Sequence, residues 1–267
     1  MESELWRTAR GFPAHHGFST RLGGTSEGAL ASLNLGRSVG DAPERVDENL
    51  RRACAAASLD LQDLHTVHQV HGADLHRVTA ELRGKARQGP RPKADALFTA
   101  EPGAALAVSV ADCVPVLMAD PAGKRVAAVH SGWRGTHAEI AAMAVSAFAA
   151  AGSRPEALRV AIGPSIRLCC YVVGKDLADQ FAERFGPEVV VEEDGNLHLD
   201  LVRAIRLTLR RAGVPDANVE VVPDCTSCEP ERYYSHRRDR GNTGRHLAFI
   251  ANAFPAFPEQ AGAGALS

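Results

Sequence analysis

The sequence lacks any run of about 18 apolar residues, the length with which a helix crosses a bilayer, so it predicts no membrane span. Its first residues, MESELWRTARGF, include early acidic side chains and no apolar segment of signal-peptide length, from which we expect no export and a cytoplasmic location. Charge of one sign is also missing, since 30 lysines and arginines face 32 aspartates and glutamates, a net charge of -2. This balance argues against nucleic-acid and membrane partners and favours a small-molecule substrate.

The chain is also without an internal repeat or a Pro/Gly-rich linker. With 267 residues, 45% hydrophobic and 23% charged, it is long enough to fill a core and has the composition of a globular protein. We predict a single catalytic domain over residues 1–254 and a frayed tail over residues 255–267. The six cysteines are expected to be reduced, and therefore available as ligands or nucleophiles.

Strand-like and helix-like segments alternate irregularly along the chain. Apolar runs predict strands at residues 64–70, 104–111, 114–119, 125–130, 158–163, 219–222 and 246–251. Helices are predicted from Asp41 and Pro43 to Ser58, from a capping box at Thr136 and Glu139 to Gly152, and over residues 175–185 and 199–212. Short turns such as DPAGK (120–124) between neighbouring strands favour a mixed sheet in an α/β domain.

The segment VHQVHG (67–72) is dense in histidine. If it is a strand, alternation places His68 and His71 on opposite faces, so the two do not act as joint ligands. Gly72 permits another group to approach closely beside His71. A hydrogen-bonded polar histidine is the simpler alternative to a ligand at either position.

Cys113 and His130 interrupt or end two other apolar runs. Cys113 follows Asp112 at the junction of two predicted strands, where it is either a small buried hydrophobe or a thiolate beside a cation or metal. His130 precedes the turn SGWRG and a predicted helix start, an arrangement that presents backbone N–H groups and Arg134 to an anion. Arg134 can instead stack on Trp133.

His71, Cys113 and His130 thus share a position at the end of an apolar run. Their wide spacing matches no zinc finger. Two imidazoles and one thiolate nevertheless form a Cys/His₂ set that suits Zn²⁺ and leaves a fourth position open, as in catalytic rather than structural sites. Spacing alone does not bring residues this distant together, so the set is a hypothesis until the fold is known.

Ordered motifs cover most of the chain. They are HGFSTRLGGTSEG (16–28), SLNLG (32–36), VGDAPERVDENLRR (39–52), HQVHG (68–72), KADALFT (93–99), ADCVPVLMAD (111–120), HSGWRGT (130–136), IGPSIRLCCYVVG (162–174) and DCTSCEPERYYSHRRDRGNTGRHLAFI (224–250). In these motifs the sequence resembles the YfiH-type family of multicopper polyphenol oxidases, also called laccase-like. Members of that family are also described as purine nucleoside phosphorylases with adenosine deaminase activity.

The resemblance implies that His71 of the QVHG motif, Cys113 of the ADC motif and His130 of the HSGWRG motif are the metal ligands and catalytic residues. Ser131 stands where the family usually has alanine, which leaves the ligands intact. The family fold is a single-domain, four-layer α/β/β/α sandwich with mixed sheets, shared with a deamidating toxin domain. The implied cofactor is Zn²⁺, with copper as the other possibility.

The resemblance further implies a zinc-dependent enzyme that acts on a purine nucleoside and phosphate. The reactions would be phosphorolysis of inosine, guanosine, adenosine or methylthioadenosine, and deamination of adenosine. Phosphorolysis needs cations that bind phosphate, and the motifs offer Arg21, Arg134 and either Arg237 or Arg238. Asp112 or Glu139 would orient groups near the metal, or serve only as a structural cap.

Three other functions stay open. A copper polyphenol oxidase agrees with the older family label, but none of the 11 histidines forms the His-x-His pair that laccases use. A cysteine hydrolase would use Cys113 as nucleophile and His130 or His71 as base, which fits an amide hydrolase that edits peptidoglycan precursors. A binding protein with a structural metal is the non-catalytic alternative.

Four cysteines remain outside this scheme. Cys225 and Cys228 form a CxxC pair, but no second CxxC follows, and the adjacent Cys169 and Cys170 have the wrong spacing for one. We predict a structural role or none for the pair.

Overall fold

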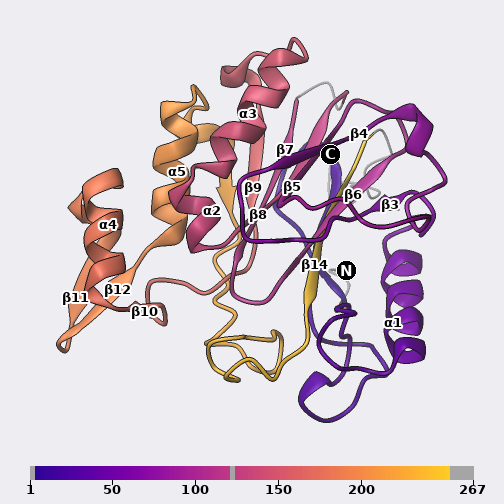
Figure 1. Cartoon of the computed structure of the whole chain (residues 1–267), viewed down its shortest axis with the longest axis horizontal. Helices are drawn as coiled ribbons and strands as arrows, with labels where there is room; N and C mark the ends of the chain where they lie inside the picture. Colours follow the sequence, from indigo (N-terminus) through magenta and orange to yellow (C-terminus); the bar gives the residue numbers. More distant parts are fainter. Residues whose placement is uncertain (1–3, 121–123, 253–267) are drawn as a thin grey trace, which may run out of the picture.

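Two β-sheets stacked face to face form the middle of the computed structural model, which describes residues 4–120 and 124–252 (Figure 1). Both sheets mix parallel and antiparallel neighbours. In spatial order, the five-stranded sheet contains β1 (Trp6–Arg7), β2 (His15–Ser19), β14 (His246–Ala251), β6 (Ala105–Val110) and β3 (Leu64–His65). The six-stranded sheet contains β13 (Val219–Val221), β9 (Arg159–Ile162), β7 (Val114–Ala119), β8 (Val126–Ser131), β5 (Ala96–Thr99) and β4 (Leu75–Val78).

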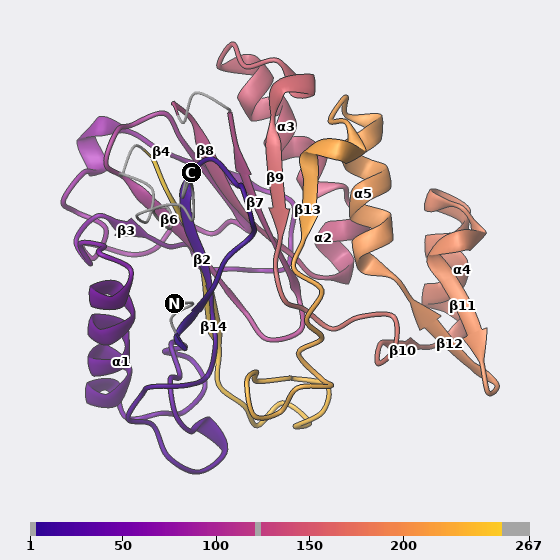
Figure 2. The same cartoon turned by 180° about the vertical axis from the view of Figure 1, so that it is seen from behind.

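Helices cover the outer face of each sheet. On the five-stranded sheet lies α1 (Pro43–Ala56), and on the six-stranded sheet lie α2 (Trp133–His137), α3 (Ile140–Ala150) and α5 (Leu201–Arg211). Figure 2 shows these two groups of helices at opposite sides of the paired sheets. The predicted four-layer α/β/β/α sandwich is therefore confirmed.

A small third sheet extends from the helical side. It consists of β10 (Val172–Val173), β12 (Asn196–Leu199) and β11 (Val190–Glu193), and α4 (Lys175–Phe185) packs against it. Short 3₁₀ helices occupy Gly28–Leu30, Ala80–Leu82, Pro155–Ala157, Pro187–Val189 and Asp216–Asn218. None of the described helices is both long and apolar enough to cross a membrane.

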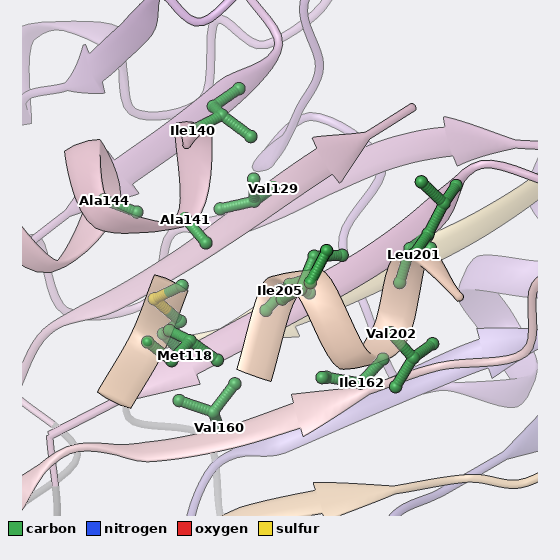
Figure 3. Close-up of a cluster of buried hydrophobic side chains, with 14 of the residues drawn as sticks. Met118, Val129, Ile140, Ala141, Ala144, Val160, Ile162, Leu201, Val202 and Ile205 are labelled. Atoms are coloured by element: carbon green, nitrogen blue, oxygen red, sulfur yellow. The ribbon is translucent and has the colours of Figure 1, made fainter. Parts of the chain in front are cut away.

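Alternation along the central strands builds the two inner cores. Leu117 in β7 and Ala128 in β8 lie between the sheets, whereas their neighbours Met118 and Val129 face the helices. Figure 3 shows Met118 and Val129 in one buried cluster with side chains of α3 and α5 such as Ala141 and Ile205. Strands buried on both faces read as continuous apolar runs, which is why the sequence identifies them.

Most predicted elements are present. The runs at 104–111, 114–119, 125–130, 158–163, 219–222 and 246–251 correspond to β6, β7, β8, β9, β13 and β14. The predicted helices at 175–185 and 199–212 correspond to α4 and α5. The helix that starts at Pro43 is α1, although Ala42 rather than Asp41 is the residue before it. The predicted tail at 255–267 and part of the DPAGK turn lie outside the described residues.

Two local predictions are wrong. The strand expected over residues 64–70 ends at His65, and only an isolated bridge between His68 and Lys93 continues it. The capping box does not form, because Glu139 has φ 57° between two helices and its carboxylate pairs with Arg184 and Arg211 instead. The one long helix expected from Thr136 is therefore two helices, α2 and α3.

A buried histidine makes the fold sensitive to acid. His16 accepts a hydrogen bond from the Ala9 N–H at Nε2 and lies 2.8 Å from the Ala14 carbonyl at Nδ1, an arrangement that needs the neutral ring. Burial lowers the pKa of His16 from 6.5 to about 4, so the unfolded chain binds this proton more readily than the folded one between those values. The free energy of unfolding of the metal-free protein should therefore fall by roughly 2 to 3 kcal/mol as the pH drops from 6.5 to 4.

Urea unfolding at several pH values measures this dependence. His16→Gln should lose part of the slope below pH 6.5, and substitution of the exposed His68 by Gln should keep it. Equal slopes in both variants would show that His16 does not carry the effect.

Candidate metal centre

The side chains of His71, Cys113 and His130 meet at one place. One ligand atom of each lies within 4.8 Å of those of the other two. Cys113 sits where the chain crosses from β6 in one sheet to β7 in the other, and His130 lies in β8, opposite Pro115 of β7. His71 belongs to the loop between β3 and β4. The pairing of β7 with β8 and the crossing between sheets thus bring together residues that are far apart in sequence.

Asp95, just before β5, holds two members of this group. Its carboxylate accepts the Nδ1–H of His130 at 2.8 Å, which leaves Nε2 of that ring free to bind a metal. It also accepts the backbone N–H groups of Val70, His71 and Gly72 at 3.1, 3.0 and 2.7 Å. Asp95 is fully buried, and one carboxylate therefore sets both the ring of His130 and the backbone of His71.

The His71 loop needs this support because its conformation is unusual. His71 has φ 59°, in the left-handed region that non-glycine residues rarely adopt. The side-chain amide of Gln69 adds a second attachment, since it donates to the Ser109 carbonyl of β6 and accepts the Ser109 N–H. These contacts offset the cost of the strained backbone.

The turn that carries Cys113 is held in the same way. Asp112 has φ 82°, and its carboxylate accepts hydrogen bonds from the Thr226 and Ser235 hydroxyls and from the Arg237 N–H. The Asp112 carbonyl accepts the Ile166 N–H at 3.0 Å. Asp112 therefore positions Cys113, and Glu139, whose carboxylate pairs with arginines of the helical layer, has no part in the centre.

Charge at the centre favours an ion pair in the absence of metal. Burial alone raises the pKa of the Cys113 thiol, but the charge of His130 and hydrogen bonds from both histidines outweigh it and lower that pKa to about 6. Burial alone lowers the pKa of His130, but the thiolate and Asp95 outweigh it and raise that pKa to about 9. A divalent cation would replace the proton shared in this pair.

The three side chains fit a zinc-like cation. Two imidazole nitrogens and one thiolate sulfur are ligands that Zn²⁺ prefers, and no fourth His, Cys, Asp or Glu joins the group within the described ranges. Gly132 leaves room beside them, because a Cβ there would lie 3.0 Å from Cys113 Sγ and 3.3 Å from His71 Cδ2. The centre therefore has three protein ligands at most and an accessible side.

Gly132→Ala tests that fit. The added methyl group presses on Cys113 and His71. We therefore expect zinc affinity to fall about tenfold, the lower end of what changes around metal ligands cost, while the fold is retained. Competition with a chromophoric chelator measures the affinity. Gly174→Ala, where a Cβ would meet nothing within 4 Å, is the matched control, and equal affinities in the two variants would contradict the fit.

A cavity of about 860 Å³ opens onto the centre, a volume suited to a nucleoside-sized ligand. All three candidate ligands line it, together with the aromatic rings of Trp133 and Tyr171. Six arginines also line it, namely Arg37, Arg87, Arg91, Arg134, Arg237 and Arg245, whereas Asp112 is the one acidic lining residue among those described. Arg37 and Arg87 both pair with Asp47, but the wall as a whole keeps an excess of positive charge, which attracts an anionic ligand.

The structure separates the arginines predicted to bind phosphate. Arg134 and Arg237 line the cavity, where their guanidinium groups lie over the rings of Trp133 and Tyr171 at 4.2 and 4.9 Å. Arg21 does not line it, because its guanidinium donates to the carbonyls of Ala31 and Pro230. Arg238 donates to the Thr226 and Tyr233 carbonyls and does not line it either. Arg237 lines the cavity although one of its N–H groups donates to the Val172 carbonyl at 2.5 Å.

His68 occupies an unexpected position. Because the strand stops at His65, the alternation argument does not apply, and the exposed His68 lines the same cavity as His71. The prediction that the two point to opposite faces is therefore wrong. His68 is nevertheless outside the group of three possible ligands.

Sequence reasoning missed Asp95 and His236. His236 lines the cavity beside Arg237, and Asp95 orients the two histidines as described above. A signal for Asp95 was present, since an acidic residue interrupts the apolar start of ADALFT (94–99). A carboxylate in such a place needs buried hydrogen-bond donors.

Known proteins match nearly the whole chain. The family model described as multi-copper polyphenol oxidoreductase laccase matches residues 15–253. Purine nucleoside phosphorylase YlmD of Geobacillus stearothermophilus is 41% identical over 242 residues, 88% of each chain, and its crystal structure covers 94% of this chain and 97% of its own at a TM-score of 0.88. Purine nucleoside phosphorylase YfiH of Escherichia coli is 36% identical over 234 residues, 87% of this chain and 91% of that protein. The chain belongs to this laccase-like, YfiH-type family.

Proposed function

We propose that the protein is a zinc-dependent purine nucleoside phosphorylase with its active centre at His71, Cys113 and His130. The observation that carries this proposal is the arginine-lined cavity that opens onto the three ligands. The relatives YlmD and YfiH are named purine nucleoside phosphorylases, which supports the same reaction here. A zinc ion held by these residues would supply a Lewis acid that polarises an oxygen or lowers the pKa of a water molecule.

The other steps of the reaction are assigned to side chains that line the cavity. In phosphorolysis an oxygen of phosphate bonds to C1′ of the ribose while the bond from C1′ to the purine breaks, and the purine leaves with the electron pair and takes up a proton. Arg134 and Arg237 bind the phosphate, and the ring of Trp133 contacts the purine. His68 and His236 line the cavity without being ligands, and in this proposal one of them supplies the proton.

The laccase label fits the residues less well. Multicopper oxidation needs several copper sites, whereas the described residues form two groups of three or more possible ligands, and one of these consists of cysteines alone. Oxygen uptake with a phenol after copper loading would detect such an activity. Deamination of adenosine belongs to the same proposal, and release of inosine and ammonia from adenosine tests it.

One observation favours a second function. His130 lies between Cys113 and Asp95, the order found in cysteine hydrolases, in which the histidine is the base and the carboxylate orients it. An amide hydrolase acting on peptidoglycan precursors would use this arrangement without a metal. Iodoacetamide labelling, read at Cys113 by peptide mass spectrometry, distinguishes the two functions. A metal-bound thiolate should react only after chelation, whereas a catalytic thiolate reacts at once.

The phosphate contacts give a prediction. Arg134→Ala and Arg237→Ala should each raise the KM for phosphate by about 10- to 100-fold, the value of a charge-assisted hydrogen bond, and change the KM for inosine much less. Steady-state kinetics with each substrate varied in turn measures both constants. Arg154→Ala, at an exposed position outside the cavity, is the control. A phosphate KM that stays at the wild-type value in both cavity variants would remove these residues from the phosphate site.

Formation of hypoxanthine and ribose 1-phosphate from inosine and phosphate tests the function itself. Chromatography that detects both products, together with metal analysis of the same sample, is the direct assay. Release of hypoxanthine without consumption of phosphate would indicate hydrolysis and contradict the proposal.

A further inference from the structure

Four cysteines that the proposed function does not use meet at a second place in the fold. Cys169 and Cys170 lie in the loop after β9, and Cys225 and Cys228 lie in the loop after β13. Because β9 and β13 are parallel neighbours, both loops leave the same edge of the sheet. The four Sγ atoms lie within 4.8 Å of one another, and none forms a disulfide.

The sulfur positions match a tetrahedral metal site. With zinc–sulfur bonds of about 2.3 Å, the edges of a regular tetrahedron of thiolates measure about 3.8 Å. In the structure, Cys228 Sγ lies 3.6 Å from Cys169 Sγ and 3.3 Å from Cys170 Sγ. These two distances and the 4.8 Å limit on the others bracket the edge of that tetrahedron.

One cation lies beside the four sulfurs. Arg167 precedes Cys169 in the same loop, and its Nε–H donates to the carbonyl of Asp224, next to Cys225, at 3.2 Å. The guanidinium of Arg167 interacts with Cys225 and Cys169, and its buried Nη1 has no hydrogen-bond partner among the described residues. A cation here offsets part of the double negative charge of a zinc ion with four thiolates.

We propose that Cys169, Cys170, Cys225 and Cys228 bind a structural Zn²⁺, separate from the ion at His71, Cys113 and His130. The ligand chemistry differs between the two sites, because four thiolates fill the tetrahedron and leave no position for a substrate. Neither the presence of this ion nor its test depends on which reaction the cavity performs.

The second ion would crosslink the loop after β9 to the loop after β13, and both loops contact the first centre or its cavity. Thr226, between the two cysteines of one loop, donates to Asp112 at 2.6 Å, and its N–H donates to the Ser165 carbonyl of the other loop. Tyr171, next to Cys170, lines the cavity. The zinc thus links the Cys113 turn to one wall of the cavity, and its loss should loosen both.

Metal analysis of variants tests the proposal. The protein is purified with reductant and zinc and without chelators, and zinc, copper and iron are measured per chain. We expect about two zinc ions in the wild type, about one in Cys228→Ser and about one in Cys113→Ala. Cys54→Ala, at a buried cysteine outside both groups, should keep two. One zinc in the wild type and none in Cys113→Ala would overturn the proposal, as would iron bound by the four cysteines.

Cobalt loading of the wild type and of Cys113→Ala keeps the test valid if Cys228→Ser fails to fold. Four of the five thiolates that could bind metal belong to the second group, so Cys113→Ala should retain about four fifths of the thiolate-to-cobalt absorption. Absorption that disappears entirely in Cys113→Ala would contradict the second site. A native mass lower by four hydrogens would show two disulfides instead, with the same consequence.

Discussion

Cys113→Ala should lose the metal at the candidate centre and reduce kcat/KM for phosphorolysis of inosine by on the order of 10³-fold. The expected size follows from the several kcal/mol of charge stabilisation that a catalytic metal contributes, since 1.4 kcal/mol corresponds to a factor of ten. Cys113 supplies the one thiolate of the group, and the two histidines alone form a weaker site. Metal content and kinetics are measured on the same sample.

Two control variants separate this effect from general damage. Cys54→Ala removes a buried cysteine of α1, away from the centre, and should keep the wild-type metal content and kcat/KM. His68→Ala removes a cavity histidine that is not a ligand and should keep the metal. If Cys113→Ala lost the metal at this centre and retained full activity, that metal would have no role in the reaction.

Asp95→Ala should have the second largest effect, although Asp95 is not itself a ligand. Its buried carboxylate accepts four hydrogen bonds, one from His130 and three from the backbone of the His71 loop. Loss of a residue that orients metal ligands typically weakens metal binding by about 10- to 100-fold. The donors left buried without a partner should also lower the free energy of unfolding by about 3 kcal/mol or more.

Asp95→Asn distinguishes a carboxylate that orients the metal ligands from a side chain that only fills space. Asp95→Asn keeps the shape of the side chain but replaces an accepting oxygen with a donor, so it should recover part of the stability and little of the zinc affinity. Chelator competition and urea unfolding of the metal-free protein provide the two readouts. Wild-type zinc affinity in Asp95→Asn would show that the carboxylate only fills space. Asp74→Ala, at an exposed position nearby, is the control.

Apolar runs predicted the fold well, because strands such as β7 and β8 are buried on both faces and leave a continuous signal in the sequence. The ligand set at His71, Cys113 and His130 came mainly from motif resemblance. Periodicity could not have joined these residues, because the crossing between the two sheets brings them together. The strand argument that separated His68 from His71 failed because the chain leaves the sheet at His65.

Other features depend on tertiary contacts that no local pattern encodes. The four-cysteine group forms only because β9 and β13 are parallel neighbours, so the loop of Cys169 and the loop of Cys225 emerge side by side. Thr136 and Glu139 have the spacing of a capping box, but Glu139 finds arginine partners on α4 and α5. In each case a long-range contact outweighs the local preference.

The central claim is that metal at the His71, Cys113 and His130 centre is required for phosphorolysis. Its most direct measurement is formation of ribose 1-phosphate from inosine and phosphate by one preparation in three states, as purified, metal-free and reloaded with zinc. Because the cavity opens onto the Cys113 centre, we predict that the rate disappears in the metal-free protein and returns with zinc in the wild type but not in Cys113→Ala. Equal rates in the metal-free and zinc-loaded protein would contradict the claim.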